Sequence, residues 1–246
     1  MAISTNSIIH YTDDLKKLES ILREGLAIKY CAETLIMGED ASSLAAHPMI
    51  SFCDIPLSQS YKHFNAYGRY GIGLTKSWAN LNGVNPVLYL DSNSSISRTL
   101  NNLIIERRKT KSNLTDSQKM DILRIKCFAK NYSGRLKRKA VDKTNYRFYD
   151  EREWRLVPEA KELESSPFSV SLKIYDADKN KYNDAIKDIR FTFESKDVAY
   201  IIVDKTDEIP KVINTIRACY SAKCTAQELD ILFSKICSTE QITDDY

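Results

Sequence analysis

The pattern of apolar and polar residues predicts a helix near the start of the chain. Thr12 and Asp13 can cap this helix, and Gly25 can end it. Its apolar face would consist of Leu15, Leu18, Ile21 and Leu22. The preceding segment, IIHY at 8–11, is then a short strand or turn that places His10 immediately before a helix.

Short apolar segments bounded by turn residues predict several strands. They are PMISFCDIP at 48–56, GRYGIGLT at 68–75, NPVLYLD at 85–91, EWRLVP at 153–158, FSVSLKIY at 168–175, IRFTF at 189–193 and VAYIIVD at 198–204. The last segment is apolar enough for the centre of a sheet, and FSVSLKIY alternates with period two.

Helical spacing returns between about 97 and 147, where two helices are predicted with the basic linker RRKTKSN between them, and the basic residues continue into RLKRKAVDK. Two further helices are predicted near the end of the chain, at about 212–219 and from Thr225, where TAQE has the form of a capping box. Many short strands with a helical insertion predict a single α+β domain over residues 1–246.

A chain of 246 residues that is 43% hydrophobic is long enough to bury a core. Its net charge of +3 conceals an uneven distribution, because residues 97–147 contain fifteen Lys and Arg against four acids. Aromatic residues lie near the end of this segment, at Tyr132, Tyr146, Phe148 and Tyr149. Such a surface suits DNA or RNA, whose phosphates the cations would neutralise and whose unpaired bases would stack on the rings. The alternative is a solvated charged face.

The first residues, MAISTNSIIHYT, lack the pattern of a signal peptide, and no apolar run approaches the roughly 20 residues that a membrane span needs. The six cysteines are scattered without a C-x-x-C pair, which favours reduced thiols. We therefore expect a cytoplasmic protein. The sequence also lacks the ligand spacing of a zinc site, so no metal is expected. It likewise lacks the G-x-S-x-G turn of a hydrolase and the glycine loop of a nucleotide-binding protein.

The segment EREWRLVP at 151–158 places two acids two positions apart. On a strand, Glu151, Glu153 and Arg155 would line one face, with Arg152 and Trp154 on the other. The two acids are either the charged face of an edge strand or a catalytic carboxylate pair with partners elsewhere in the chain.

Aromatic residues recur every three positions at Tyr61, Phe64, Tyr67 and Tyr70. This spacing is typical of a packed helical face. Tyrosine also suits a half-exposed stacking site, because its ring is apolar while its hydroxyl stays hydrated.

Four segments together resemble a family of bacterial phage-defence proteins. IIHYTDDLKKLESILREGLAIKYCAE, PMISFCDIPLSQ, YGRYGIGLTKSWANLNGVNPVLYL and EREWRLVP are similar to the AbiG-type abortive-infection proteins (AbiGi), a family described as an antitoxin. More distantly, the H-Y-T turn, the SF strand, the Y-x-x-YGIG segment and the E-x-E-W-R strand resemble the order of parts in ADP-ribosyltransferases of the His-Tyr-Glu kind. The second resemblance implies an ADP-ribosyltransferase-like split β-sheet core with flanking helices, into which the basic helical segment at about 97–147 is inserted.

Transfer of ADP-ribose from NAD passes through an oxocarbenium-like state that a carboxylate stabilises. The resemblance implies that Glu153, directly before Trp-Arg, is this catalytic carboxylate and that Glu151 positions the acceptor. The residues implied to bind NAD are His10, Tyr11, Ser51, Tyr67 and Tyr70, with one of the last two stacking on nicotinamide.

The leading hypothesis is thus a phage-defence or toxin-antitoxin component that uses NAD to ADP-ribosylate nucleic acid or a host protein. The alternative is a non-enzymatic antitoxin or regulatory partner that binds and neutralises a toxin. Retention of His10, the tyrosines and Glu153 together favours the enzyme. A Mg²⁺-dependent nuclease built on Asp54 and Glu151 ranks behind both, because the sequence lacks the acid-x-lysine spacing that we would expect of it.

Overall fold

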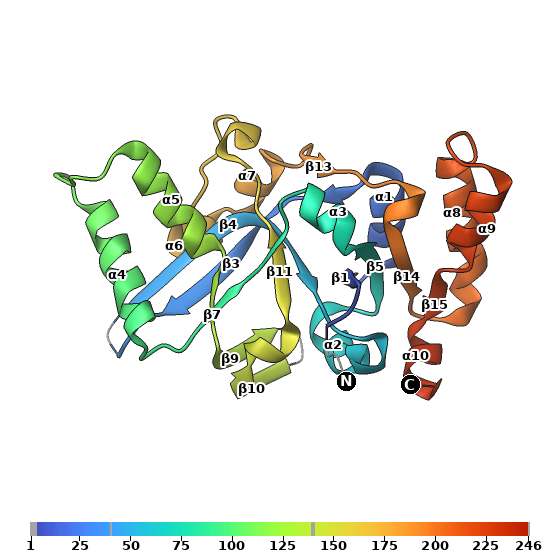
Figure 1. Cartoon of the computed structure of the whole chain (residues 1–246), viewed down its shortest axis with the longest axis horizontal. Coiled ribbons are helices and arrows are strands. Elements are labelled where there is room, and N and C mark those ends of the chain that lie inside the picture. Colours follow the sequence, from blue (N-terminus) through green and yellow to red (C-terminus); the bar gives the residue numbers. More distant parts are fainter. Residues whose placement is uncertain (1–3, 40, 139–140, 246) are drawn as a thin grey trace.

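The computed structural model describes residues 4–39, 41–138 and 141–245, and these confirm a mixed α+β structure (Figure 1). The helices are α1 Leu15–Glu24, α2 Leu57–Tyr67, α3 Lys76–Leu81, α4 Ser95–Arg108, α5 Asp116–Cys127, α6 Leu172–Ala177, α7 Lys179–Asp184, α8 Ile209–Tyr220, α9 Ala226–Phe233 and α10 Thr239–Asp245. The strands are β1 Ser7–Thr12, β2 Leu26–Ala27, β3 Lys29–Ile36, β4 Ser42–Cys53, β5 Tyr70–Thr75, β6 Asn85–Pro86, β7 Leu88–Leu90, β8 Ala129–Asn131, β9 Ser133–Arg138, β10 Val141–Arg147, β11 Glu153–Leu156, β12 Val170–Ser171, β13 Arg190–Phe191, β14 Val198–Val203 and β15 Ile236–Ser238.

The main sheet runs in the order β15-β14-β5-β1-β4-β11-β6, and β3 and β12 also pair with β4. Strand β4 is the longest of the described strands. Its residues 42–49 pair with β3, and its residues 50–53 pair with β11. It therefore runs through both halves of the sheet, as the long light-blue arrow in Figure 1 shows.

The two halves of the sheet meet where β1 lies beside β4. Within the described residues, these strands pair at Ile9 and Cys53 alone, whereas β1 pairs with β5 along its whole length. The register between β4 and β11 places Glu153 opposite Cys53. Ile9, Cys53 and Glu153 therefore form a row across three strands at this junction.

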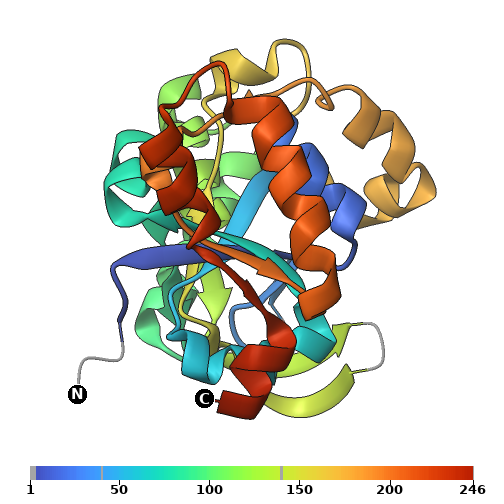
Figure 2. The same cartoon turned by 90° about the vertical axis from the view of Figure 1, so that its right-hand side faces the viewer.

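Helices pack on both faces of the sheet (Figure 2). Helices α1 and α8 contact each other and contribute Leu18 and Ile216 to the main core. On the opposite face, Ile9 packs with Phe64 of α2 and Ile242 of α10. This arrangement follows from the alternation of side chains along β1, which sends adjacent residues into different cores.

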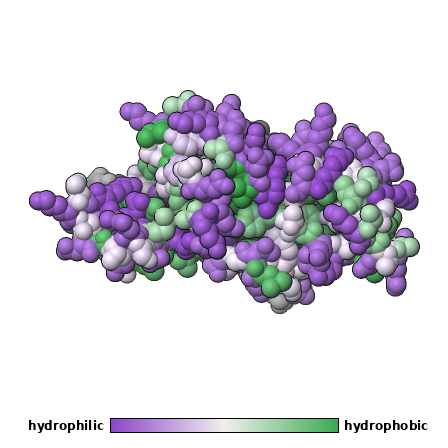
Figure 3. All heavy atoms as spheres, turned by 90° about the horizontal axis from the view of Figure 1, so that it is seen from above, coloured by the Kyte–Doolittle hydropathy of each residue, from purple (hydrophilic) through white to green (hydrophobic). Residues whose placement is uncertain are grey.

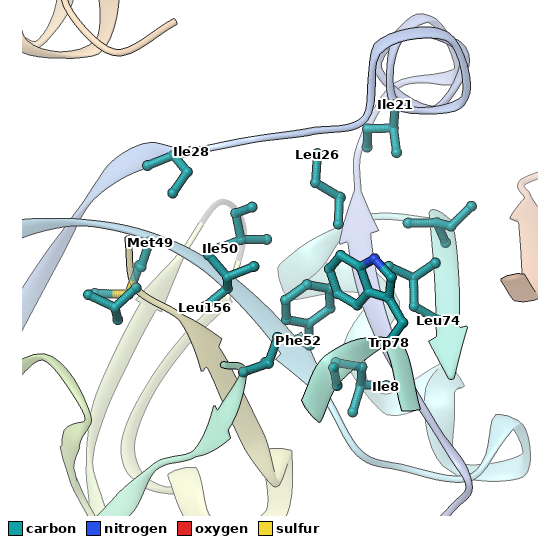
Figure 4. Packing of buried hydrophobic residues seen from close by; sticks show 14 of the residues in the cluster. Ile8, Ile21, Leu26, Ile28, Met49, Ile50, Phe52, Leu74, Trp78 and Leu156 are labelled. Atoms are coloured by element: carbon teal, nitrogen blue, oxygen red, sulfur yellow. The ribbon is translucent and has the colours of Figure 1, made fainter. Parts of the chain in front are cut away.

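The centre of the main core is built from large side chains of both sheet halves. Figure 4 shows Ile8, Phe52, Leu74 and Trp78 lying together there. The rings of Phe52 and Trp78 meet edge to face with their centroids 6.0 Å apart, a favoured aromatic geometry. Phe52 precedes Cys53 on β4, so this core fixes the strand next to the junction.

Local signals located several elements correctly. Helix α1 ends at Gly25, which has φ 88°, although its capping residue is Asp14, one position later than expected. Helix α9 begins after Thr225 with both hydrogen bonds of the predicted capping box. The tyrosine repeat forms α2 as far as Tyr67, whereas Tyr70 already belongs to β5.

Other predictions were wrong because tertiary contacts decide the local structure. FSVSLKIY forms only the two-residue strand β12 and then enters α6, where the Tyr175 hydroxyl donates to the Tyr30 carbonyl at 2.8 Å. Its period-two alternation therefore does not reflect a strand. Residues 76–84, which lie between two predicted strands and had no predicted element, contain α3, which Thr75 caps. Strand β3 carried no recognisable signal, since few of its residues are buried.

The basic segment contains the two predicted helices, α4 and α5, at the left of Figure 1. The residues that follow form strands rather than a linker. Strands β9 and β10 pair antiparallel at the lower edge of the molecule. Lys139 and Ala140, part of the predicted basic run, lie outside the described residues.

The surface seen from above in Figure 3 is mostly hydrophilic, with small hydrophobic patches between the charged side chains. Among the helices of the described residues, none has the length and apolar character that crossing a bilayer requires. The six cysteines are free thiols in the structure.

A buried histidine in β4 gives the fold a defined response to acid. His47 is 1% exposed, its Nε2 has no partner among the described residues, and its Nδ1 lies 3.4 Å from the Phe168 carbonyl. Burial, followed by the charge of Lys126, lowers the pKa of His47 to about 3. The unfolded chain therefore binds a proton between about pH 6.5 and 3 that the folded chain does not bind.

We expect His47→Gln to make unfolding less sensitive to acid. In the wild type, this residue lowers the free energy of unfolding by up to about 1.4 kcal/mol for each pH unit between about 6.5 and 3, and glutamine does not titrate. Urea unfolding at a series of pH values measures the slope. An unchanged slope below pH 6 would show that His47 is already protonated in the folded state.

Candidate functional site

Glu153 lies at the start of β11 and is surrounded by hydrogen-bond donors. Its Oε1 accepts from the Ser51 hydroxyl and from Arg155 Nε, both at 2.8 Å. Its Oε2 accepts from Lys130 Nζ at 2.7 Å and from Arg155 Nη2 at 3.2 Å. The side chain is only 6% exposed. Ser51 and Glu153, two of the predicted site residues, are therefore in direct contact.

Arg155 is the central cation of this cluster, and it is completely buried. Besides Glu153, it contacts Glu33 of β3 at 3.1 Å and donates to the Cys127 carbonyl at 2.6 Å. The sequence placed Arg155 on the same strand face as Glu153 but gave it no role. Its other partners lie far away in sequence, so no local pattern indicated them.

Lys130 of β8 bridges the two acids of the EREWRLVP segment. Its Nζ lies 2.7 Å from a Glu153 oxygen and 3.4 Å from a Glu151 oxygen. Glu151 is not on β11, however, because it ends the 3-10 turn η1 (Phe148–Glu151), and Arg152 then adopts φ 46°. The prediction that Glu151 and Glu153 share a strand face was wrong, and Lys130 brings them together instead.

Charge compensation fixes the ionisation of this cluster. Burial alone would raise the pKa of Glu153, but Arg155 and Lys130 outweigh it and hold that pKa well below its ordinary value. Burial alone would lower the pKa of Lys130, but Glu153, Glu33 and Glu151 raise it above its usual range. Glu153 and Lys130 are thus both charged at neutral pH.

His10 reaches the cluster through the backbone of Ser51. Its Nδ1 lies 2.9 Å from the Ser51 carbonyl oxygen, and its ring packs edge to face on Phe52. Burial lowers the pKa of His10, with smaller contributions from Lys29 and Arg138. A neutral imidazole that donates from Nδ1 leaves Nε2 as an acceptor. His10 was implied to bind NAD, and with its Nδ1 bonded to Ser51 its Nε2 could serve a ligand only as an acceptor.

Of the two tyrosines implied to stack on nicotinamide, Tyr67 joins the cluster. Its hydroxyl donates to Glu151, and the Arg138 guanidinium lies over its ring at 4.6 Å. Burial and the adjacent Glu151 raise the pKa of Tyr67. One face of its ring is thus already occupied by a cation.

Two other predicted NAD-binding residues lie apart from Glu153. The Tyr11 hydroxyl donates to Ser60 at 2.7 Å, and its ring packs against Phe64 in the core beneath α2. The Tyr70 hydroxyl donates to Glu208 at 2.8 Å. The structure therefore gathers five of the seven predicted site residues, Glu151, Glu153, His10, Ser51 and Tyr67, and separates Tyr11 and Tyr70 from them.

The carboxylates considered for a nuclease are held separately. Asp54 accepts from Lys76 at 2.8 Å and from Ser4, whereas Glu151 accepts from Tyr67 and lies beside Lys130. Both acids are thus already bonded to neighbouring side chains, so neither is an open ligand for a divalent cation.

Comparison with known proteins identifies relatives of the chain. A family model described as "Putative abortive phage resistance protein AbiGi, antitoxin" matches residues 25–204. The chain is also 29% identical over 221 residues to the "Abortive phage resistance protein AbiGi" of Lactococcus lactis subsp. cremoris, which covers 81% of this chain and 88% of that protein. No solved structure matches the chain. Because the family model spans most of the chain, including β4 and β11, the protein belongs to the AbiGi family of abortive phage resistance proteins.

Proposed function

We propose that this protein serves phage defence as an antitoxin that binds and neutralises a toxin protein, and that it does so without transferring ADP-ribose. The observation that carries this proposal is the saturation of Glu153. Both of its oxygens already accept hydrogen bonds, from Ser51, Lys130 and Arg155.

This environment is unsuited to the chemistry of NAD cleavage. A ribose hydroxyl would have to displace one of the existing donors to reach Glu153. The developing oxocarbenium charge would also lie beside two buried cations, Lys130 and Arg155, which oppose the attraction of the Glu153 carboxylate. The buried ion pairs therefore support a structural role for Glu153 in the fold of a binding protein. The description of the matching family as an antitoxin supports the same function.

NAD labelled on its adenylate phosphate tests the enzymatic part of the proposal. We expect the wild type to leave NAD intact and to transfer no label into a bacterial lysate, while an active ADP-ribosyltransferase assayed in parallel does so. Label that the wild type transfers, that Glu153→Gln abolishes and that Tyr70→Phe retains would overturn the proposal. Tyr70→Phe is the matched control, because its hydroxyl bonds to Glu208 outside the cluster.

Growth of cells that express the toxin of the same defence locus tests the neutralising part. We expect the wild type and Ser51→Ala to restore growth equally, because Ser51→Ala removes one donor to Glu153 and leaves the ion pairs with Lys130 and Arg155. A failure of the wild type to restore growth or to bind that toxin would contradict the antitoxin role.

One observation favours ADP-ribosyl transfer as the second candidate. Ser51 contacts Glu153 through its hydroxyl and His10 through its carbonyl, so a histidine, a serine and a glutamate adjoin at the junction of the two sheet halves. An enzyme of this kind would have to release Lys130 from Glu153 when NAD binds. The labelling experiment decides between the two candidates.

A further inference from the structure

A second region of unusual electrostatics lies in the basic segment and shares no residue with the Glu153 cluster. A cavity of about 190 Å³ opens between β4, α4, α5 and β12. Three cations line it, Arg107 and Arg108 at the end of α4 and Lys126 near the end of α5. Ser169 and Ser171 also line it.

The cations in this cavity have no counter-charge within the described residues. Arg107 Nε donates to the Lys119 carbonyl at 3.0 Å, and Arg108 Nη2 lies 3.4 Å from the Ser43 hydroxyl. Lys126 is 6% exposed, yet its ammonium has neither an ion pair nor a hydrogen bond among the residues that the structure describes. Three cations that line one cavity without an acidic partner among the described residues suit an external anion.

Lys130 provides an internal comparison for Lys126. Both lysines are largely buried, but Lys130 contacts two glutamates, which raise its pKa. Lys126 faces arginines instead, and burial, followed by Arg108 and Arg107, lowers its pKa to about 8. The positive charge of Lys130 is thus compensated by glutamates, whereas that of Lys126 is repelled by neighbouring arginines.

Helix ends explain only part of this arrangement. Cations in the last turn of a helix interact favourably with its dipole, which accounts for one cation at the end of α4 and one at the end of α5. The dipoles do not account for the close approach of three cations, one of them buried. A bound dianion would satisfy all three.

We propose that this cavity binds the terminal phosphate of a phosphate monoester. Guanidinium groups bind phosphate oxygens through paired hydrogen bonds, and the lysine ammonium and serine hydroxyls add further donors. The volume exceeds the space that a single water requires, and it accommodates one phosphate group rather than a whole nucleotide. The rest of the ligand, a nucleoside or the end of a nucleic-acid strand, would extend into solvent.

Thermal unfolding in potassium phosphate tests this site, with ionic strength held constant by KCl. We expect the wild-type Tm to rise by about 3–6 °C when phosphate reaches about ten times its Kd. Lys126→Met and Arg107→Gln should abolish the rise. Lys111→Met, which removes the same charge from an exposed position of the same segment, should retain it. Lys126→Met should also unfold at a higher temperature than the wild type in KCl alone, because it removes the repulsion of the buried Lys126 by Arg107 and Arg108.

Binding measurements then distinguish the sources of the phosphate. A 5′-phosphorylated oligonucleotide that binds more tightly than its 5′-hydroxyl counterpart, with the difference lost in Lys126→Met, supports a nucleic-acid end. A nucleoside monophosphate that binds with the same dependence on Lys126, while the oligonucleotide does not, supports a small metabolite. A rise in Tm that chloride reproduces at equal ionic strength, or that Lys126→Met and Arg107→Gln both retain, would overturn the proposal.

Discussion

Replacement of Arg155 by methionine is expected to lower the free energy of unfolding by about 3–5 kcal/mol. Arg155 is completely buried and contacts Glu153 and Glu33, so its loss leaves carboxylates without their main counter-charge inside the protein. Methionine fills a similar space, which limits the contribution of a cavity. Urea unfolding followed by circular dichroism measures the change.

Arg135→Met is the matched control for this experiment. Arg135 also makes a two-bond ion pair, with Asp142 at 2.9 and 2.7 Å, but its side chain is 60% exposed. Surface ion pairs contribute little to stability, so we expect a small change.

A double-mutant cycle identifies the partner of Arg155. Glu153→Gln alone leaves Arg155 and Lys130 partly unpaired, so it is expected to destabilise as well. The double substitution Glu153→Gln with Arg155→Met should cost less than the sum of the two by about 0.5–3 kcal/mol, because the interaction is lost only once. Strict additivity would show that the two side chains do not interact in solution.

The second large effect is expected for Gly68→Ala, at the end of α2. Gly68 has φ 115°, and a Cβ atom there would lie 2.1 Å from the Thr12 carbonyl oxygen. The Thr12 oxygen belongs to the backbone, and the position of the added Cβ is fixed by the backbone of residue 68. The clash is therefore relieved only if β1 and α2 move apart. We expect a loss of about 3 kcal/mol or more, which is a fall in Tm of at least about 6 °C for a chain of this size.

Gly38→Ala separates backbone strain from the clash. Gly38 has φ 131°, and nothing lies within 4 Å of the position of its Cβ. This variant should lose only the strain of an unfavourable φ, about 1–2 kcal/mol. Equal losses for the two variants would show that the close approach of Gly68 to the Thr12 carbonyl adds no cost beyond the strain of an unfavourable φ.

Elements with strong end signals could be predicted from the sequence. Gly25 ends α1, and Thr225 begins α9, because capping depends on residues within one turn of the helix. The strand prediction for 168–175 was wrong because the second half of these alternating residues belongs to a helix, which Tyr175 anchors through the Tyr30 carbonyl. That bond joins positions 145 residues apart, so it has no local signal.

The candidate site was predictable to a similar extent. The resemblance to ADP-ribosyltransferases implied that Ser51 and Glu153 share one site, and the pairing of β4 with β11 brings them into contact. The role of Lys130 depends on β8, and that of Glu33 on β3, which the sequence did not reveal as strands. Without these partners, Glu153 resembled an open catalytic carboxylate. The cations that neutralise it became recognisable only in the folded structure.

The pairing of strand β4 on its whole length affects how fast its own amide protons exchange with solvent. Its Ala45 lines the phosphate cavity and its Ser51 belongs to the Glu153 cluster, and the two lie about 20 Å apart along one extended strand. Between them, every stretch of β4 is hydrogen-bonded to β3, β11 or β12. We infer that the central amides of β4 exchange only when the whole sheet opens. Local fluctuations at either site therefore leave the strand that joins them intact.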